Sequence, residues 1–307
     1  MLRIAHITDL HVLSDRGVHW REMLLNKRIT GWANVHLRRG RVHRREYLLR
    51  VLEEATRAAD HLVVTGDITN LALESEYEEA RELLDGAAVS CETTVVPGNH
   101  DIYLPPIHRE RRFQHHFGQF LRSDLPELAL DLPAGSFPCV KLRGPAAIIA
   151  LSSAVPRPPF IAAGFLGEEQ LEALGRVLDH PEVRRRFPVI MLHHPPVDER
   201  KRWHQLRDGL VDGASLRKAL ASLSRGVVLF GHLHYRMRCT LNTDEGVLEV
   251  IGASGAALDH PHTAVRSGFN LYGIEDDGRL AFAEAHVLDA AGSGFDRMEI
   301  ATRPGCS

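Results

Sequence analysis

The chain has 307 residues, a formal net charge of −3 and a hydrophobic content of 44%. These values are typical of a globular α/β protein with a substantial core, and the small net charge gives no general attraction to nucleic acid or to a membrane. No apolar run is long enough to span a bilayer, and the N-terminus enters a predicted strand without a signal peptide. The four cysteines form no metal-binding spacing, so we expect no disulfide framework and a cytoplasmic location.

The secondary structure expected from the sequence alternates between strands and helices over the first 230 residues. Short apolar runs predict strands at residues 3–8, 61–65, 93–96, 146–152, 189–192 and 227–230. Apolar residues at helical spacing predict helices at residues 44–59, 75–86, 168–178 and 214–223, the second of them starting with a Ser75–Glu78 capping box.

After residue 236 the pattern changes to consecutive strands joined by turns, at residues 246–251, 270–274 and 279–285. The whole order predicts two packed β-sheets covered by helices. We assign residues 1–307 to a single domain, with insertion or cap segments at about 17–45 and 102–140. The proline-rich residues 156–159 are expected to form a loop at the active site or on the surface.

Five of the predicted strands are followed directly by polar residues that can bind metal. These stretches are Asp9-Leu10-His11, Gly66-Asp67-Ile68-Thr69-Asn70, Gly98-Asn99-His100-Asp101, His193-His194 and Gly231-His232-Leu233-His234. Ligands of α/β sheets bind at the carboxyl ends of strands, so these residues are expected to meet. Three of the stretches begin with a glycine, which permits a sharp turn and a close approach of the backbone to its surroundings.

The chemistry of these side chains indicates a metal centre. Carboxylates, an amide oxygen and imidazoles form a donor set without thiolate, which suits Mn, Fe or Zn. Two such ions can hold a phosphate between them and activate the water that attacks it. The chain contains neither a Gly-x-Ser-x-Gly elbow nor a Walker loop, so a serine hydrolase and an ATP-driven enzyme are not supported.

The series of motifs resembles the calcineurin-like metallophosphoesterase superfamily over residues 3–234. The resemblance implies a four-layer α-β-β-α sandwich of two mixed sheets and two divalent metal ions, between which a hydroxide attacks phosphorus. It implies one metal held by Asp9, His11, Asp67 and His234, and a second held by Asp67, Asn99, His193 and His232. His100 would then act as the acid for the leaving oxygen, and Asp101 would orient it.

Several side chains near the motifs leave alternatives open. His193 is preferred to His194 as the ligand because it comes first off the strand and His194 precedes a stiff Pro-Pro turn. Asn70 either caps a turn or orients a ligand or substrate. His260 and His262 are more consistent with a surface loop than with the metal centre.

The substrate is less clearly indicated by the sequence than the reaction. The motifs and their flanks resemble the bacterial cyclic-nucleotide-type (class III) phosphodiesterases, which implies a small phosphodiester or nucleotide as substrate. Residues 21–45 are basic and apolar in alternation, and are either an insertion helix packed beside the site or a helix that binds an anionic membrane surface.

Two alternatives follow from these observations. If residues 21–45 bind lipid, the substrate would be a lipid-linked pyrophosphate, as in UDP-2,3-diacylglucosamine hydrolases, and the protein would lie at the inner face of the membrane. A nucleic-acid substrate, steered by the same arginines, is less favoured. A non-catalytic scaffold with this fold is disfavoured because every expected ligand and His100 are present.

Overall fold

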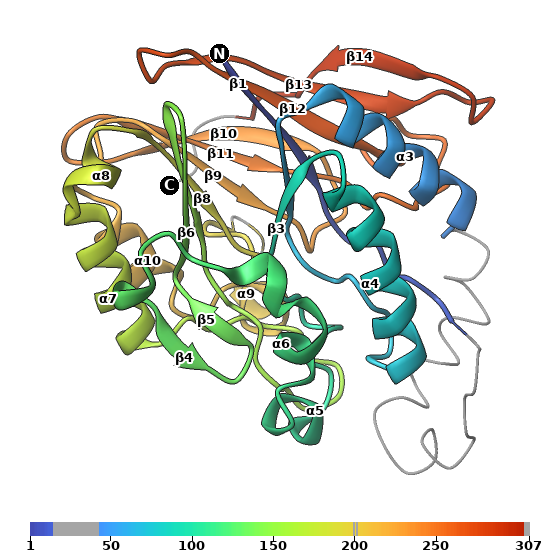
Figure 1. Cartoon of the computed structure of the whole chain (residues 1–307), viewed down its shortest axis with the longest axis horizontal. Coiled ribbons are helices and arrows are strands. Elements are labelled where there is room, and N and C mark those ends of the chain that lie inside the picture. The colour runs from blue at the N-terminus through green and yellow to red at the C-terminus, as the bar shows by residue number, and fades with distance from the viewer. Residues whose placement is uncertain (15–42, 199, 201, 304–307) are drawn as a thin grey trace.

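The fold is an α/β sandwich with two mixed six-stranded sheets flanked by helices (Figure 1). We describe it from a computed structural model, which covers residues 1–14, 43–198, 200 and 202–303. The predicted four-layer fold is confirmed. The basic helical insertion expected near residues 17–45 lies outside the described residues, apart from residues 43–45.

The first sheet has the strand order β14-β13-β12-β1-β2-β3. Strands β1, β2 and β3 are parallel, whereas β12 runs antiparallel to β1 and begins an antiparallel edge that β13 and β14 complete. The bounds are β1 Leu2–Ile7, β2 His61–Val64, β3 Glu92–Val95, β12 Gly268–Ile274, β13 Leu280–Leu288 and β14 Phe295–Glu299.

The second sheet has the strand order β10-β11-β9-β8-β7-β6. Its four central strands are parallel and its two edge strands are antiparallel to their neighbours. The bounds are β6 Cys139–Arg143, β7 Ala146–Ala150, β8 Phe187–Met191, β9 Val227–Phe230, β10 Met237–Asn242 and β11 Val247–Gly252. A separate hairpin joins β4 Leu130–Leu132 to β5 Gly135–Phe137.

Helices cover the outer face of each sheet (Figure 1). Helices α3 and α4 pack on the first sheet, and α7, α8 and α10 lie on the side of the second. Helices α5, α6 and α9 lie in the connections between strands. The bounds are α3 Arg45–Ala58, α4 Glu74–Ala88, α5 Pro105–Arg109, α6 Arg112–Phe117, α7 Glu168–Asp179, α8 Pro181–Arg184, α9 Arg202–Asp208 and α10 Gly213–Ala219.

The strands β7, β8 and β9 in the middle of the second sheet are apolar at every position because both of their faces are buried. Along β7, Ile148 packs into the core between the sheets and its neighbour Ile149 packs into the core under α7 and α10. Met191 and Ile190 divide between the same two cores on β8. This alternation follows from the two-residue period of a strand, and it explains why the sequence shows continuous apolar runs here.

Two local predictions were wrong. The acid that caps α4 is Glu76, not Glu78, and its carboxylate accepts backbone hydrogen bonds from Asn70, Leu71 and Leu73 at 2.7–3.2 Å. Cys239 is buried and disulfide-bonded, which the low cysteine content did not suggest.

The 102–140 segment contains α5, α6 and the β4–β5 hairpin, and its assignment as a cap stays a prediction. None of the helices formed by the described residues is long and apolar enough to cross a bilayer.

Candidate metal centre

The predicted ligands come together where strands of both sheets end. Backbone hydrogen bonds carry the pairing of β1 and β2 into their loops, from Asp9 N to Gly66 O and from His11 N to Asp67 O, each 3.0 Å long. The second sheet reaches the same place because the ring of His193 donates from Nδ1 to Thr65 O at 2.6 Å. The site therefore forms only when the two sheets are packed together.

Several residues of this site have a strained backbone conformation. Eight residues other than glycine have a positive φ in the described part of the chain, and five of them are predicted ligands. These five are Asp9, His11, Asp67, His232 and His234, with φ between 44° and 65°. Such residues usually cost about 1 kcal/mol or more each, and they cluster at functional sites where the surrounding structure enforces them. The strain supports a functional reason for the five conformations.

Two of the motif glycines are required by close packing. A Cβ atom at Gly98 would lie 2.2 Å from both the backbone nitrogen and Oδ1 of Asp67. At Gly231 it would lie 1.9 Å from the hydroxyl of Thr8 and 2.9 Å from Oδ2 of Asp9. Only glycine allows these loops to approach the two carboxylates so closely.

The first donor group contains one oxygen from each of two carboxylates and two imidazole nitrogens. The Nε2 atom of His234 lies 3.3 Å from Asp9 Oδ1, and Nε2 of His11 lies 3.8 Å from Asp67 Oδ2. The two Nε2 atoms are 3.5 Å apart. These four side chains satisfy the spacing needed to hold one metal ion.

The second donor group surrounds Nε2 of His193. This nitrogen lies 3.1 Å from Asn99 Oδ1, 3.2 Å from His232 Nδ1 and 3.4 Å from Asp67 Oδ1. The Nδ1 proton of the ring is donated to Thr65, so Nε2 is the ring atom that faces the other three donor atoms. Without its second proton, this Nε2 could bind a cation placed among the four atoms.

Asp67 thus belongs to both donor groups, through a different oxygen in each. Its side chain is buried, and it also accepts a hydrogen bond on Oδ1 from His100 N at 2.8 Å. Burial alone would raise the pKa of the Asp67 carboxyl, but His193 and His100 hold it well below its usual value. The carboxylate is therefore charged and suited to lie between two metal ions.

His194 lies beside the second group and is a plausible ligand by spacing alone. Both of its ring nitrogens are occupied, however: Nδ1 lies 2.8 Å from Ser153 Oγ, and Nε2 donates to Ala162 O at 2.8 Å. Burial lowers its pKa to about 3, so the ring is neutral and can accept the Ser153 hydroxyl. Asn99 and Asp67 therefore complete the second group better than His194, which instead anchors the loop around Ala162.

The residues fit two divalent metal ions. Asp9 is fully buried, and its Oδ1 atom accepts no hydrogen bond from the described residues although it faces the imidazoles of the first group. Burial raises the pKa of the Asp9 carboxyl, because the charged form is removed from water. A bound ion would satisfy the oxygen, and the nitrogen and oxygen donors suit Mn, Fe or Zn.

The structure brings His100 to the centre but does not orient it as expected. Its ring packs edge-to-face on His11, with 4.9 Å between centroids, and its Nδ1 donates to the backbone oxygen of Asn70 at 2.5 Å. Asp101 instead accepts hydrogen bonds from the backbone of Ile68, Thr69 and Gly98. The predicted role of Asp101 in orienting His100 is wrong, because its oxygens brace the two loops that carry Asp67 and Asn99.

Two contacts near the metal centre were missed in the sequence. The hydroxyl of Thr8 donates to Asp9 Oδ2 at 2.8 Å, and His232 N donates to the same oxygen at 3.1 Å. The ring of His43 packs edge-to-face against His11, with centroids 4.9 Å apart. Thr8 could have been suspected from its position next to Asp9, whereas His43 is 32 residues from His11 and carries no motif.

Other sequence features lie away from the donor groups. Arg44 and Arg45, the described end of the basic segment, pair with Asp259 and Glu79. His260 and His262 cap their own turn by accepting backbone hydrogen bonds.

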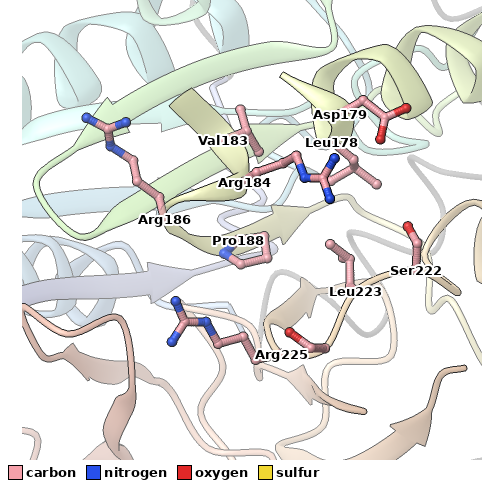
Figure 2. A pocket seen from close by; sticks show the side chains of 10 residues that line it. Leu178, Asp179, Val183, Arg184, Arg186, Pro188, Ser222, Leu223 and Arg225 are labelled. Carbon is pink, nitrogen blue, oxygen red and sulfur yellow. The ribbon is translucent and has the colours of Figure 1, made fainter. Parts of the chain in front are cut away.

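A cavity of about 220 Å³ is shown in Figure 2, and Pro188 and Arg225 place it at the amino ends of β8 and β9. The candidate ligands follow the opposite ends of these strands. The guanidinium groups of Arg184, Arg186 and Arg225 point in different directions around this cavity (Figure 2).

The fold and these donor groups define a metal-dependent hydrolase with two candidate metal sites that share a carboxylate. The family model for calcineurin-like phosphoesterases matches residues 2–236, and the chain belongs to this family. It is accordingly a metal-dependent phosphoesterase. No curated protein is significantly similar to the chain in sequence.

Solved structures share the fold at low sequence identity. A dimetal phosphatase from Danio rerio superposes with a TM-score of 0.56 at 15% identity, covering 97% of each chain. Purple acid phosphatase PPD1 from yellow lupin gives a TM-score of 0.55 at 12% identity, covering 99% of this chain and 54% of the lupin protein. These similarities support the fold, and the substrate has to be inferred from the site.

Proposed function

We propose that the protein hydrolyses a small phosphodiester, a cyclic nucleotide or a related nucleotide, with two divalent metal ions. The observation that carries this proposal is the position of Asp67, whose two oxygens face two separate sets of nitrogen and oxygen donors. Paired ions of this kind supply charge neutralisation for the phosphate and activate water for its attack.

The ligand assignment follows from the two donor groups. Asp9, His11, Asp67 and His234 would hold the first ion, and Asp67, Asn99, His193 and His232 the second. Of these side chains only Asp9 and Asp67 are anionic, so two divalent ions leave the site with a positive charge. That charge favours a phosphodiester anion over a neutral ester.

His100 is proposed as the acid that protonates the leaving oxygen. The Asn70 carbonyl holds the proton on Nδ1, and this fixes the plane of the ring. When the ring is doubly protonated, Nε2–H can be transferred to the leaving oxygen and Nδ1–H stays on Asn70. A residue in this role contributes about 10²- to 10⁴-fold to the rate.

The choice of a phosphodiester rests on the resemblance of the motifs to class III phosphodiesterases. The residues that suggested a lipid-linked pyrophosphate instead, 21–42, lie outside the described residues. Both alternatives use the same metal centre. A substrate panel of cyclic nucleotides, glycerophosphodiesters and UDP-2,3-diacylglucosamine would separate them, and exclusive turnover of the lipid substrate would refute our choice.

The metal proposal is tested with the variant Asp67→Asn. The apo protein is titrated with Mn²⁺, Fe²⁺ or Zn²⁺, and both the bound metal and the hydrolysis of bis-p-nitrophenyl phosphate are measured. We expect two ions per wild-type chain, and loss of at least one ion together with at least ~100-fold lower activity in the variant. Asp244→Asn, which removes an exposed carboxylate, should retain both. Full metal content and activity in Asp67→Asn would contradict the proposal.

A further inference from the structure

The side chain of Tyr103 packs against the face of the His100 ring. The two rings are stacked, with centroids 5.5 Å apart and an angle of 23° between their planes. Aromatic rings at such a separation attract each other and prefer defined relative orientations. Because only 6% of Tyr103 is exposed, its ring forms a buried surface against which the imidazole lies.

With Tyr103 included, three contacts of different kinds hold the His100 ring. The hydrogen bond from Nδ1 to the Asn70 carbonyl fixes one edge of the ring. The contact with His11 is nearly perpendicular, at 89°, whereas the contact with Tyr103 is nearly parallel and covers a face. A single hydrogen bond leaves a ring able to tilt about that bond, so the packing contacts are needed to set the direction of Nε2.

The backbone that carries Tyr103 is itself fixed. Its turn begins at Gly98, whose carbonyl accepts hydrogen bonds from the backbone of Asp101 at 3.2 Å and of Ile102 at 3.3 Å. The buried carboxylate of Asp101 accepts backbone hydrogen bonds from both neighbouring loops, and its carbonyl accepts the hydroxyl of Tyr77. The ring of Tyr103 is therefore held in place by the same turn that carries His100.

We propose that Tyr103 is a positioning residue for the phosphoester reaction and acts through His100. Its ring keeps the imidazole in the orientation in which Nε2 can protonate the leaving oxygen. This inference rests on the proposed function of His100 as the acid. Proton transfer requires the donor to lie within hydrogen-bond distance of the leaving oxygen, and a displacement of about 1 Å can cost about 100-fold in rate.

A buried aromatic residue can also serve the core alone, and the two roles predict different kinetics. A core role lowers stability and leaves the chemistry of the folded enzyme unchanged. A positioning role lowers kcat while KM stays the same, and the loss is larger when the leaving group is a strong base that has to be protonated. The loss also disappears when His100 is replaced, because Tyr103 acts only through that ring.

The test compares Tyr103→Phe, which retains the ring, with Tyr103→Leu, which does not. Hydrolysis of bis-p-nitrophenyl phosphate and of diphenyl phosphate is measured with the full, metal-loaded chain, since p-nitrophenolate leaves readily and the more basic phenolate needs protonation. For Tyr103→Leu we expect kcat on diphenyl phosphate to fall by about 10- to 100-fold at an unchanged KM, with a smaller loss on the p-nitrophenyl ester. Tyr103→Phe should behave as the wild type does, and metal titration of the apo forms should give the same number of ions for all three proteins.

Two controls separate positioning from packing. Phe113→Leu is the matched control, because Phe113 is a buried aromatic residue of the same 102–140 segment and packs on Phe117. It should be less stable in urea unfolding and keep the wild-type ratio of the two activities. In the second control, Tyr103→Leu is added to His100→Gln, and we expect no further loss of kcat because the two residues act as one unit.

Four results would overturn the proposal. The first is an unchanged kcat on diphenyl phosphate in Tyr103→Leu, and the second is an equal loss in Tyr103→Phe, which would assign the effect to the hydroxyl. The third is an additive loss in the double variant, and the fourth is the loss of a metal ion in Tyr103→Leu, which would make Tyr103 a support of the metal centre instead. An unimpaired His100→Gln would remove the proposed acid and this inference with it, whereas an impaired His100→Gln with an unimpaired Tyr103→Leu removes this inference alone.

Discussion

The hydrogen bond from Thr8 to Asp9 provides a sensitive test of how the metal centre is assembled. The hydroxyl of Thr8 and the backbone of His232 both donate to Asp9 Oδ2, which directs Oδ1 toward the first donor group. Thr8→Val removes the hydroxyl and keeps the shape of the side chain. One of the two hydrogen bonds that fix the carboxylate is then lost.

The expected magnitude follows from the kind of bond. A hydrogen bond to a charged group contributes about 1.5–3 kcal/mol. If most of this free energy orients the Asp9 carboxylate toward the metal, the affinity for one of the two ions should fall by about 10- to 100-fold in Thr8→Val. A loss of this size is usual for groups that support metal ligands. The affinity for the other ion should change less, because Asp9 belongs to the first donor group.

Isothermal titration of the apo protein with Mn²⁺ or Zn²⁺ measures both affinities. Thr8→Ser retains the hydroxyl and should bind metal nearly as the wild type does. Unchanged affinity in Thr8→Val would refute the reasoning. If Thr8→Ser binds metal as weakly as Thr8→Val, the methyl group of Thr8 is the important feature and the hydrogen bond is not.

Three further predictions concern the loops and the core. Gly98→Ala should lower metal affinity at least ~10-fold because its Cβ would meet Asp67, whereas Gly86→Ala, in an open helical position, should raise stability by about 0.5–1 kcal/mol in urea unfolding. Asp101→Asn should cost about 1–3 kcal/mol in the same assay by leaving backbone donors unpaired; an activity loss without destabilisation would restore its expected catalytic role. Burial lowers the pKa of His6 to about 3, so the unfolded chain binds a proton below about pH 6.5 that the folded chain does not, and stability falls as pH falls. His6→Gln should therefore reduce the loss of stability between pH 7 and pH 5 by about 2 kcal/mol, and an unchanged pH dependence would show that His6 is charged in the folded protein.

The sequence alone predicted much of the fold because the buried strands have strong patterns. Strands β1, β2, β3, β8 and β9 were found within two residues of their observed bounds. The acid predicted to cap α4 was not the observed one, because the carboxylate of Glu76 accepts a hydrogen bond from Asn70, six residues earlier in the preceding loop. A local sequence pattern does not contain this contact. Edge strands such as β14 were missed because their partly exposed residues lack a continuous apolar run.

The roles of individual side chains were less predictable from the sequence. In the sequence, the preference for His193 over His194 rested on its position directly after the strand and on the stiff Pro-Pro turn that follows His194. The structure adds a physical reason, since His194 is used by Ser153 and Ala162. The assignment of His100 to Asp101 failed because neighbours in sequence need not be partners in space, and the Asn70 carbonyl is 30 residues away.

The sequence by itself determined the chemistry of this protein, because residue types and their positions at strand ends are local properties. It fixed the set of oxygen and nitrogen donors and, through the family resemblance, the reaction class. Tertiary structure alone decided which oxygen of Asp67 faces each donor group, and which groups hold Asp9 and His100 in place. Those properties depend on contacts between segments distant in sequence, which form only when the two sheets pack and the loops at their carboxyl ends close on one another.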